Sequence, residues 1–158
     1  MFLQKVVSGG QTGVDRAALD AARATDVPIG GWCPQGRRAE DGEIPDRYPL
    51  TETPSDVYAQ RTAWNVRDSD GTLIIANRLE GGTALTKRKA EKRGRPVLLV
   101  RRGEPDAVAR IRAWIEEHEL CVLNVAGPRE SEEPGIYEAA RTLLEGLFDE
   151  PSGSGRDD

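Results

Sequence analysis

Three predicted strands in this 158-residue chain each run directly into a glycine-bearing turn that is followed by a predicted helix. The turns are Ser8-Gly9-Gly10-Gln11-Thr12-Gly13, Gly81-Gly82-Thr83 and Ala126-Gly127-Pro128-Arg129-Glu130-Ser131. In an open parallel sheet, the carboxyl ends of all strands lie along one edge, where ligands bind. Exposed backbone N–H groups and helix N-termini gathered at that edge make a cradle for an anion. The sequence therefore predicts an edge site for an anionic, phosphate-bearing small molecule.

Strand and helix patterns alternate along the chain. Short apolar or β-branched runs predict strands at 3–8, 27–32, 72–76, 96–100 and 121–125. Helical spacing of apolar residues, with Pro105 at a first helical position, predicts helices at 14–25, 56–66, 83–93, 105–118 and 134–148. This alternation predicts an α/β fold with a doubly wound, mainly parallel sheet of five or six strands and helices on both faces. The strand order does not follow from the pattern.

Length and composition indicate one domain. A chain of this size buries enough surface for a single core, so we expect residues 1–150 to form one ligand-binding domain. The polar, Gly/Ser-rich residues 151–158 predict a disordered tail. Cys33 and Cys121 have neither zinc-ligand nor redox-motif spacing, which indicates a reduced, cytoplasmic setting. Without a signal region or an apolar run of membrane length, we expect a soluble protein and no membrane partner.

The charge distribution argues against nucleic acid as a partner. The formal net charge is −5, so the field of the whole chain does not favour a nucleic-acid backbone. The basic run at 87–95 is an exception that falls on a predicted helix and has no interleaved aromatic residues. It is typical of a solvated helix face, with a nucleic-acid patch as the alternative.

A segment of about twenty residues, 33–54, shows no periodicity, and a loop of that length inside a compact domain is often functional. Because it follows the second predicted strand, we expect it to emerge at the ligand edge. Arg37 and Arg38 are then candidate ligand clamps, and a solvated pair of side chains is the alternative.

The first turn nearly matches the dinucleotide-binding pattern G-x-G-x-x-G, with Ser8 at its first position. An acidic residue should close the second strand to hold a ribose hydroxyl, and its absence here disfavours ordinary NAD binding. The turn is not a P-loop either, because no Gly-Lys-Ser/Thr sequence follows it. One interpretation is a helix capping box between Thr12 and Asp15. The other is anion binding by the turn and by Arg16, one helical turn further on, and both can hold together.

The other two turns also admit two interpretations. Thr83 can cap its helix or donate a hydrogen bond to a phosphate oxygen. Arg129 offers a planar fork of donors suited to phosphate, or forms a surface ion pair with Glu130 or Glu132. The candidate ligand-binding residues are Gly9, Gly10, Gln11, Thr12, Gly13, Arg16, Arg37, Gly81, Gly82, Thr83, Gly127, Pro128, Arg129 and Ser131. No Ser-His-Asp set, acid pair or metal cluster is visible, so the pattern predicts binding rather than catalysis.

At these motifs the chain resembles the molybdenum cofactor carrier proteins. The resemblance is carried by the three glycine turns, within 8–15, 81–83 and 124–131, and by a further motif at 65–72. That family belongs to the Rossmann-like SLOG group, which is related to the LONELY GUY phosphoribohydrolases. The resemblance covers roughly residues 3 to 148.

The resemblance implies a Rossmann-like, homo-oligomeric carrier that shields the molybdenum cofactor or delivers it to molybdenum enzymes. The glycine turns and Arg129 would hold the terminal phosphate and the polar metal end of that cofactor. The phosphoribohydrolases carry a catalytic acid in the motif Gly-Gly-x-Gly-Thr-x-x-Glu, and Thr86 stands at its position here. The alternatives are a sensor or phosphoribohydrolase-type enzyme for a nucleotide or nucleotide-derived ligand, and an interaction module without a small ligand.

Overall fold

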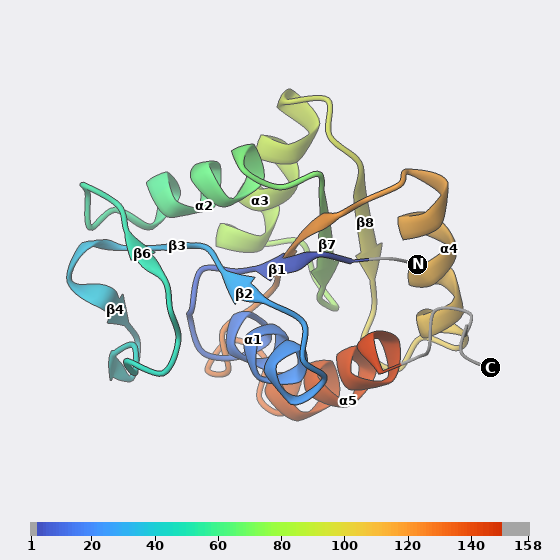
Figure 1. Cartoon of the computed structure of the whole chain (residues 1–158). Helices are drawn as coiled ribbons and strands as arrows, with labels where there is room; N and C mark the ends of the chain where they lie inside the picture. Colours follow the sequence, from blue (N-terminus) through green and yellow to red (C-terminus); the bar gives the residue numbers. More distant parts are fainter. Residues whose placement is uncertain (1–2, 150–158) are drawn as a thin grey trace.

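The computed structural model describes residues 3–149, which form a five-stranded parallel sheet with helices on both faces (Figure 1). The strands of the sheet are β1 (Lys5–Val7), β2 (Ile29–Gly30), β7 (Gly71–Ile75), β8 (Val97–Val100) and β9 (Val122–Ala126). The helices are α1 (Val14–Ala24), α2 (Tyr58–Arg67), α3 (Gly81–Lys92), α4 (Ala107–Glu117) and α5 (Ile136–Phe148). This confirms the predicted α/β class, with five strands. The predicted tail lies outside the described residues.

The topology of the sheet places the last strand of the chain at its centre. The order is β2-β1-β9-β7-β8, and all neighbouring strands are parallel. Counted from β9 and continued through β1, this order becomes 3-2-1-4-5, which is the order of a Rossmann sheet. The winding direction therefore reverses between β9 and β7. Ligands bind at such a reversal, outside the carboxyl ends of the strands.

The two faces of the sheet are covered differently. α1 and α5 pack on one face, α2 and α3 lie on the other, and α4 packs against β8 and α5 (Figure 1). All five residues of β7 are buried, as expected for a continuous apolar strand. α1 packs against α5 and the sheet, and its small side chains allow close approach; Ala17, Ala18, Ala21 and Ala22 are all fully buried in the main core.

The segment 33–54, expected to be an irregular loop, contains short regular elements. They are β3 (Trp32–Cys33), the 3₁₀ turn η1 (Gln35–Arg37), β4 (Arg38–Ala39), β5 (Gly42–Glu43) and β6 (Thr51–Glu52). β3 pairs with β6, and β4 and β5 form an antiparallel hairpin. The segment has its own small core with α1: Leu19, Cys33, Ala39, Ile44, Tyr48 and Leu50. Its apolar residues are too irregularly spaced to predict this core.

A hydrogen-bond network ties this segment to the main body. The hydroxyls of Tyr48 and Tyr137 donate to the two carboxylate oxygens of Asp20, at 2.8 and 2.5 Å. Burial, together with the Asp20 carboxylate, raises the pKa of Tyr137 to about 12. Asp20 on α1 therefore joins the segment 33–54 to α5.

Several predicted element boundaries differ from the structure: the helices expected from 56, 83 and 134 begin at 58, 81 and 136. The strand expected at 27–32 is divided at Gly31, so that β2 pairs with β1 while β3 pairs with β6. The helix expected at Pro105 begins at Ala107, because Asp106 before it adopts a left-handed conformation with φ 58°. Within residues 3–149, no helix combines the length and apolarity needed to cross a membrane.

Candidate functional site

The first and third glycine turns touch each other at the carboxyl edge of the sheet. A Cβ atom at Gly13, where φ is 81°, would lie 2.3 Å from the carbonyl oxygen of Pro128. The same carbonyl accepts a hydrogen bond from the backbone N–H of Val14 at 3.3 Å. A Cβ atom at Gly127 would lie 2.4 Å from the carbonyl oxygen of Ile75. Glycine is required at both positions because backbone passes against backbone.

The second and third turns flank a crevice between β7 and β9, where the sheet reverses direction. The crevice has a volume of ≈ 490 Å³. It is lined by Asn77, Arg78, Glu80, Thr83, Pro128, Glu132, Glu133 and Pro134. The structure therefore places a hollow where parallel α/β sheets bind ligands.

The N-terminus of α3 opens toward this crevice. A Cβ atom at Gly81 or Gly82 would meet nothing within 4 Å, so solvent reaches the backbone there. Thr83 is 6% exposed and lines the crevice, and its hydroxyl has no hydrogen-bond partner within residues 3–149. Unpaired amides and a free hydroxyl at the start of a helix suit an anionic oxygen.

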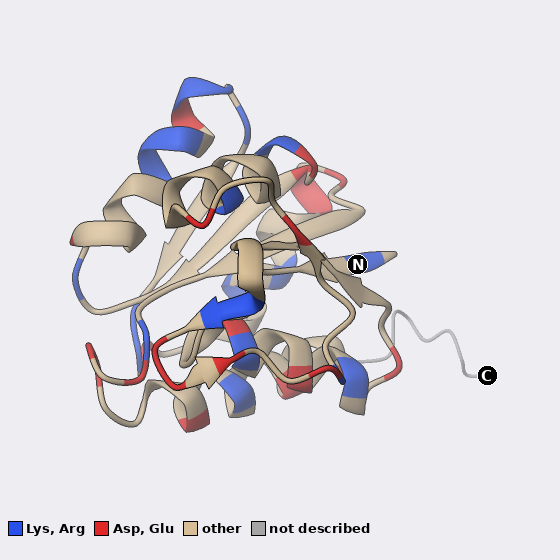
Figure 2. Cartoon of the chain, turned by 90° about the vertical axis from the view of Figure 1, so that its left-hand side faces the viewer, with Lys and Arg blue, Asp and Glu red and all other residues tan. Residues whose placement is uncertain are grey.

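The carboxylates of the crevice are each accompanied by an arginine. The pairs are Glu132 with Arg129 at 3.1 Å, Glu133 with Arg102 at 3.6 Å, and Glu80 with Arg78 at 3.9 Å. On the side of the molecule that carries the β4–β5 hairpin, acidic and basic segments lie interspersed (Figure 2). The side chains around the crevice therefore carry both positive and negative charges.

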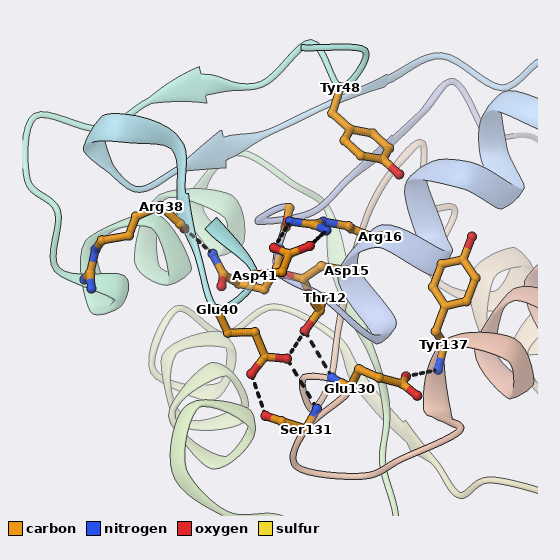
Figure 3. A network of polar contacts seen from close by, with 12 residues as sticks. Thr12, Asp15, Arg16, Arg38, Glu40, Asp41, Tyr48, Glu130, Ser131 and Tyr137 are labelled. Atoms are coloured by element: carbon orange, nitrogen blue, oxygen red, sulfur yellow. Dashed lines mark hydrogen bonds and ion pairs between the residues drawn. The ribbon is translucent and has the colours of Figure 1, made fainter. Parts of the chain in front are cut away.

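Groups from the first and third turns converge on one carboxylate, that of Glu40 (Figure 3). The hydroxyl of Thr12 donates to Oε2, and the hydroxyl of Ser131 donates to Oε1 at 2.5 Å. The backbone N–H of Ser131 donates to Oε2 at 3.3 Å, and Nη1 of Arg129 lies 3.7 Å from Oε1. Hydrogen bonds from Ser131 and Thr12 lower the pKa of Glu40. These predicted residues thus form an anion cradle that holds a carboxylate of the protein itself.

Sequence reasoning did not identify Glu40 as part of the site. It lies at the tip of the hairpin between β4 and β5, within the segment expected to be functional. The only local signal is Asp41-Gly42, a turn dipeptide next to Glu40. Nothing in that signal says which carboxylate meets which turn.

Arg16 is held beneath the same hairpin tip. Its Nη1 and Nη2 atoms donate to the two carboxylate oxygens of Asp41 at 2.6 and 2.9 Å, and Nε donates to the carbonyl of Gly10 at 3.0 Å. This bidentate pair lowers the pKa of Asp41. The structure thus gives Arg16 an internal partner, and its side chain is only 11% exposed.

The donors of Gln11 and the backbone of Gly9 are engaged within the protein, whereas Oε1 of Gln11 is buried without a hydrogen-bond partner among the described residues. The N–H of Gln11 donates to Asp15 at 3.2 Å, and the side-chain amide of Gln11 donates to the carbonyl of Arg38 at 2.9 Å. Gly9 packs against the guanidinium of Arg61, which lies 3.4 Å from the Asp15 carboxylate. Burial raises the pKa of Asp15, against the opposing effect of Arg61.

The predicted capping box is only half present. Asp15 reaches back to the turn as expected, through the N–H of Gln11. Thr12 does not cap, because Gly13 occupies the N-cap position and no side chain bonds there. The hydroxyl of Thr12 accepts from the N–H of Glu130 at 3.1 Å instead and donates to Glu40.

The structure does not bring Arg37 to the turns. Its guanidinium donates to four backbone carbonyls of the segment 33–54, at 2.8 to 3.3 Å. The guanidinium of Arg37 therefore stabilises the backbone conformation of the segment 33–54. Arg38, the neighbouring candidate, stacks over the ring of Tyr58 at 4.5 Å and donates to the carbonyl of Asp56 at 2.7 Å.

The sheet order and the placement of the crevice agree with a family comparison. The model of the circularly permutated YpsA SLOG family matches residues 6–148. The chain belongs to this family. A strand order that becomes Rossmann-like when counted from β9 is the structural form of such a permutation.

One solved structure with this fold is a close relative of this SLOG-family chain. It is the crystal structure of a "Putative molybdenum carrier protein" from Syntrophus aciditrophicus SB, with 48% identity and a TM-score of 0.89. The match covers 92% of this chain and 94% of that one. Among curated proteins, none matches significantly.

By the resemblance to the phosphoribohydrolases, Thr86 stands where their motif is expected to carry an acid. In this SLOG-family protein Thr86 is 4% exposed, and its hydroxyl donates to the carbonyl of Gly82 at 2.9 Å. A threonine cannot act as a carboxylate base near neutral pH. Within residues 3–149, no three His, Cys, Asp or Glu side chains are grouped to hold a metal ion.

Proposed function

We propose that this protein binds an anionic, phosphate-bearing small molecule without transforming it, and that this molecule is the molybdenum cofactor. The observation that carries the proposal is the convergence of Thr12, Arg129 and Ser131 on two carboxylate oxygens beside the crevice. Two hydroxyls, an amide and a guanidinium are donors that also suit phosphate oxygens. The start of α3, with the free hydroxyl of Thr83, offers a second anion contact across the crevice.

The identity of the ligand is supported by relatives rather than by geometry. The motifs resemble the molybdenum cofactor carriers, and the relative from Syntrophus bears the name "Putative molybdenum carrier protein". A carrier role agrees with a site that has many hydrogen-bond donors and, at Thr86, no carboxylate base. The proposal includes a homo-oligomer in the cytoplasm that passes the cofactor to molybdenum enzymes. Both cysteines within the described residues are free thiols, in keeping with a reducing compartment.

The direct test is retention of cofactor released from a molybdenum enzyme. The purified protein is mixed with it, separated from free cofactor by gel filtration and assayed by the fluorescence of the oxidised pterin. We expect retention well above that of an unrelated protein. Arg129→Gln should weaken binding about tenfold or more, because hydrogen bonds to charged groups contribute about 1.5–3 kcal/mol and 1.4 kcal/mol is tenfold.

The matched control is Arg110→Gln. Arg110 lies on α4, away from the turns, and pairs with Glu104 at 2.6 Å. This variant removes the same charge and should retain the cofactor like the unmodified protein. Absence of retention, or equal loss in both variants, contradicts the proposal.

A further inference from the structure

The β4–β5 hairpin inserts two adjacent carboxylates into the edge of the sheet. Glu40 bridges the first and third turns through Thr12 and Ser131, whereas Asp41 pairs with Arg16 on α1 (Figure 3). Both residues come from the two-residue tip between β4 and β5. The tip thus lies over the donors that the sequence predicts for a ligand.

The Glu40 contact imitates a bound anion. Two hydroxyls and one amide donate to its two oxygens, and the charge of Arg129 lies close by. A phosphate group presents oxygens of the same kind with more negative charge, so the same donors can bind it. Carboxylate and phosphate cannot occupy one set of donors together.

The contact is reachable from solvent, and beneath the hairpin lie chiefly two polar contacts: the Asp41–Arg16 pair and the bond from the Gln11 amide to the carbonyl of Arg38. The side chains of Glu40 and Arg129 are 21% and 38% exposed. β4 and β5 contribute two residues each, and of the tip and its flanks only Ala39 joins the small core. A Cβ atom at Gly42 would meet nothing within 4 Å. The Glu40 side chain can therefore leave the turns without disturbing the five-stranded sheet.

We infer that Glu40 is a built-in competitor for the anion site: a phosphate-bearing ligand displaces its carboxylate from Thr12, Ser131 and Arg129 and frees the Glu40 side of the hairpin tip. This inference rests on the proposed function only in requiring an anionic ligand. In the free protein, the carboxylate satisfies donors that would otherwise lie unpaired beside the crevice. On ligand binding, the Asp41–Arg16 pair keeps the hairpin attached to α1.

The test compares Glu40→Gln with Glu43→Gln, using inorganic pyrophosphate as the probe. Glu43 lies on the same hairpin and is exposed, so its substitution removes the same charge without touching the cradle. Affinity is measured by titration calorimetry, and the backbone amides of Ser131 and Gly42 are followed by NMR. Glu40→Gln should bind pyrophosphate about tenfold or more tightly than the unmodified protein, since a charged competitor is lost. Glu43→Gln should bind like the unmodified protein.

The hairpin provides a second readout. Saturating pyrophosphate should shift the amides of both Ser131 and Gly42 in the unmodified protein. In Glu40→Gln the shift of Gly42 should be smaller, because the neutral side chain binds the turns more weakly before the ligand arrives. Glu40→Asp, which keeps the charge on a shorter side chain, should bind with intermediate affinity.

The outcomes separate the two proposals. If all forms bind pyrophosphate equally, Glu40 is no competitor, although the protein still binds anions. Weaker binding by Glu40→Gln also overturns the inference and makes Glu40 part of the ligand site. If no form binds pyrophosphate, the cradle is not an anion site, and the proposed function is contradicted as well.

Discussion

The contact between the glycine turns depends on individual residues: on glycines that lack a Cβ atom and on side chains that donate hydrogen bonds. Gly127 passes a backbone carbonyl of β7, and hydroxyl and guanidinium groups around it form the cradle. The residue types at Thr12, Arg129 and Ser131 were enough to predict donors for an anion. Their present acceptor could not be predicted, because Glu40 lies 28 residues from Thr12 and 91 from Ser131 along the chain.

Gly127→Ala should destabilise the protein by about 1–3 kcal/mol, the usual cost of forcing an extra group into packed structure. Its Cβ would lie 2.4 Å from the carbonyl oxygen of Ile75 and 2.5 Å from Cγ2 of Val14. Urea unfolding followed by circular dichroism measures the change in the free energy of unfolding.

Gly146→Ala is the control for this substitution. Gly146 lies within α5, and a Cβ atom there would be 3.8 Å from Cγ2 of Val108, an ordinary contact. Alanine should therefore stabilise the helix by about 0.5–1 kcal/mol. An unchanged free energy of unfolding in Gly127→Ala would show that the third turn is not closely packed.

At the scale of elements, regular patterns predicted well and irregular ones did not. β7 and α5 were predicted from a continuous apolar run and from helical spacing, because both signals are local. The small elements within 33–54 depend instead on packing against Leu19 of α1 and on the carbonyls gathered by Arg37. Those contacts are between residues distant in sequence, so the local spacing of apolar residues does not predict them.

The hairpin tip should be released from the turns in acid. The pKa values of Glu40 and Asp41 are lowered in the folded protein, by hydrogen bonds from Ser131 and Thr12 and by Arg16. Their stabilisation is therefore fully present above the ordinary values of 4.5 and 3.8 and is lost as the pH falls through the lowered ones. Other charges facing Glu40 are Arg129 and, more weakly, Glu132.

NMR spectra recorded from about pH 6 to about pH 3 check this expectation, because the two carboxylates are protonated gradually over that range. The amide of Ser131 should shift with the protonation of Glu40 in the unmodified protein. The acid-induced shift should be much smaller in Glu40→Gln, which cannot ionise at that position. An unchanged titration of Ser131 in the variant would contradict the assignment.

The whole molecule brings together turns that are far apart in the chain. The crevice exists because β9 lies between β1 and β7, which places the third turn next to both of the others. The prediction that the turns share one edge follows from parallel strands alone. The order of those strands, and hence which turns face each other, depends on how complete helices and strands pack.

A thermal-shift comparison distinguishes the proposed carrier from a nucleotide-binding protein. The Rossmann-like order and the open start of α3 also suit a nucleotide phosphate. A ligand at a hundred times its dissociation constant adds about 2.7 kcal/mol to stability. We expect stabilisation by released molybdenum cofactor and little by nucleotides. Strong shifts with nucleotides alone, or release of a free base, would favour the sensor or hydrolase instead.

From the sequence alone came the strand–turn–helix alternation, the α/β class and the hydrogen-bond donors that the structure finds in contact with Glu40. These depend on side-chain periodicity and residue type, which act between near neighbours in the chain. The tertiary structure decided that β9 occupies the centre, that Arg37 serves the segment 33–54, and that Glu40 fills the cradle. These contacts join residues that are far apart in the sequence. They form only when the whole chain packs, because packing is what brings the charged groups and backbone segments within reach of each other.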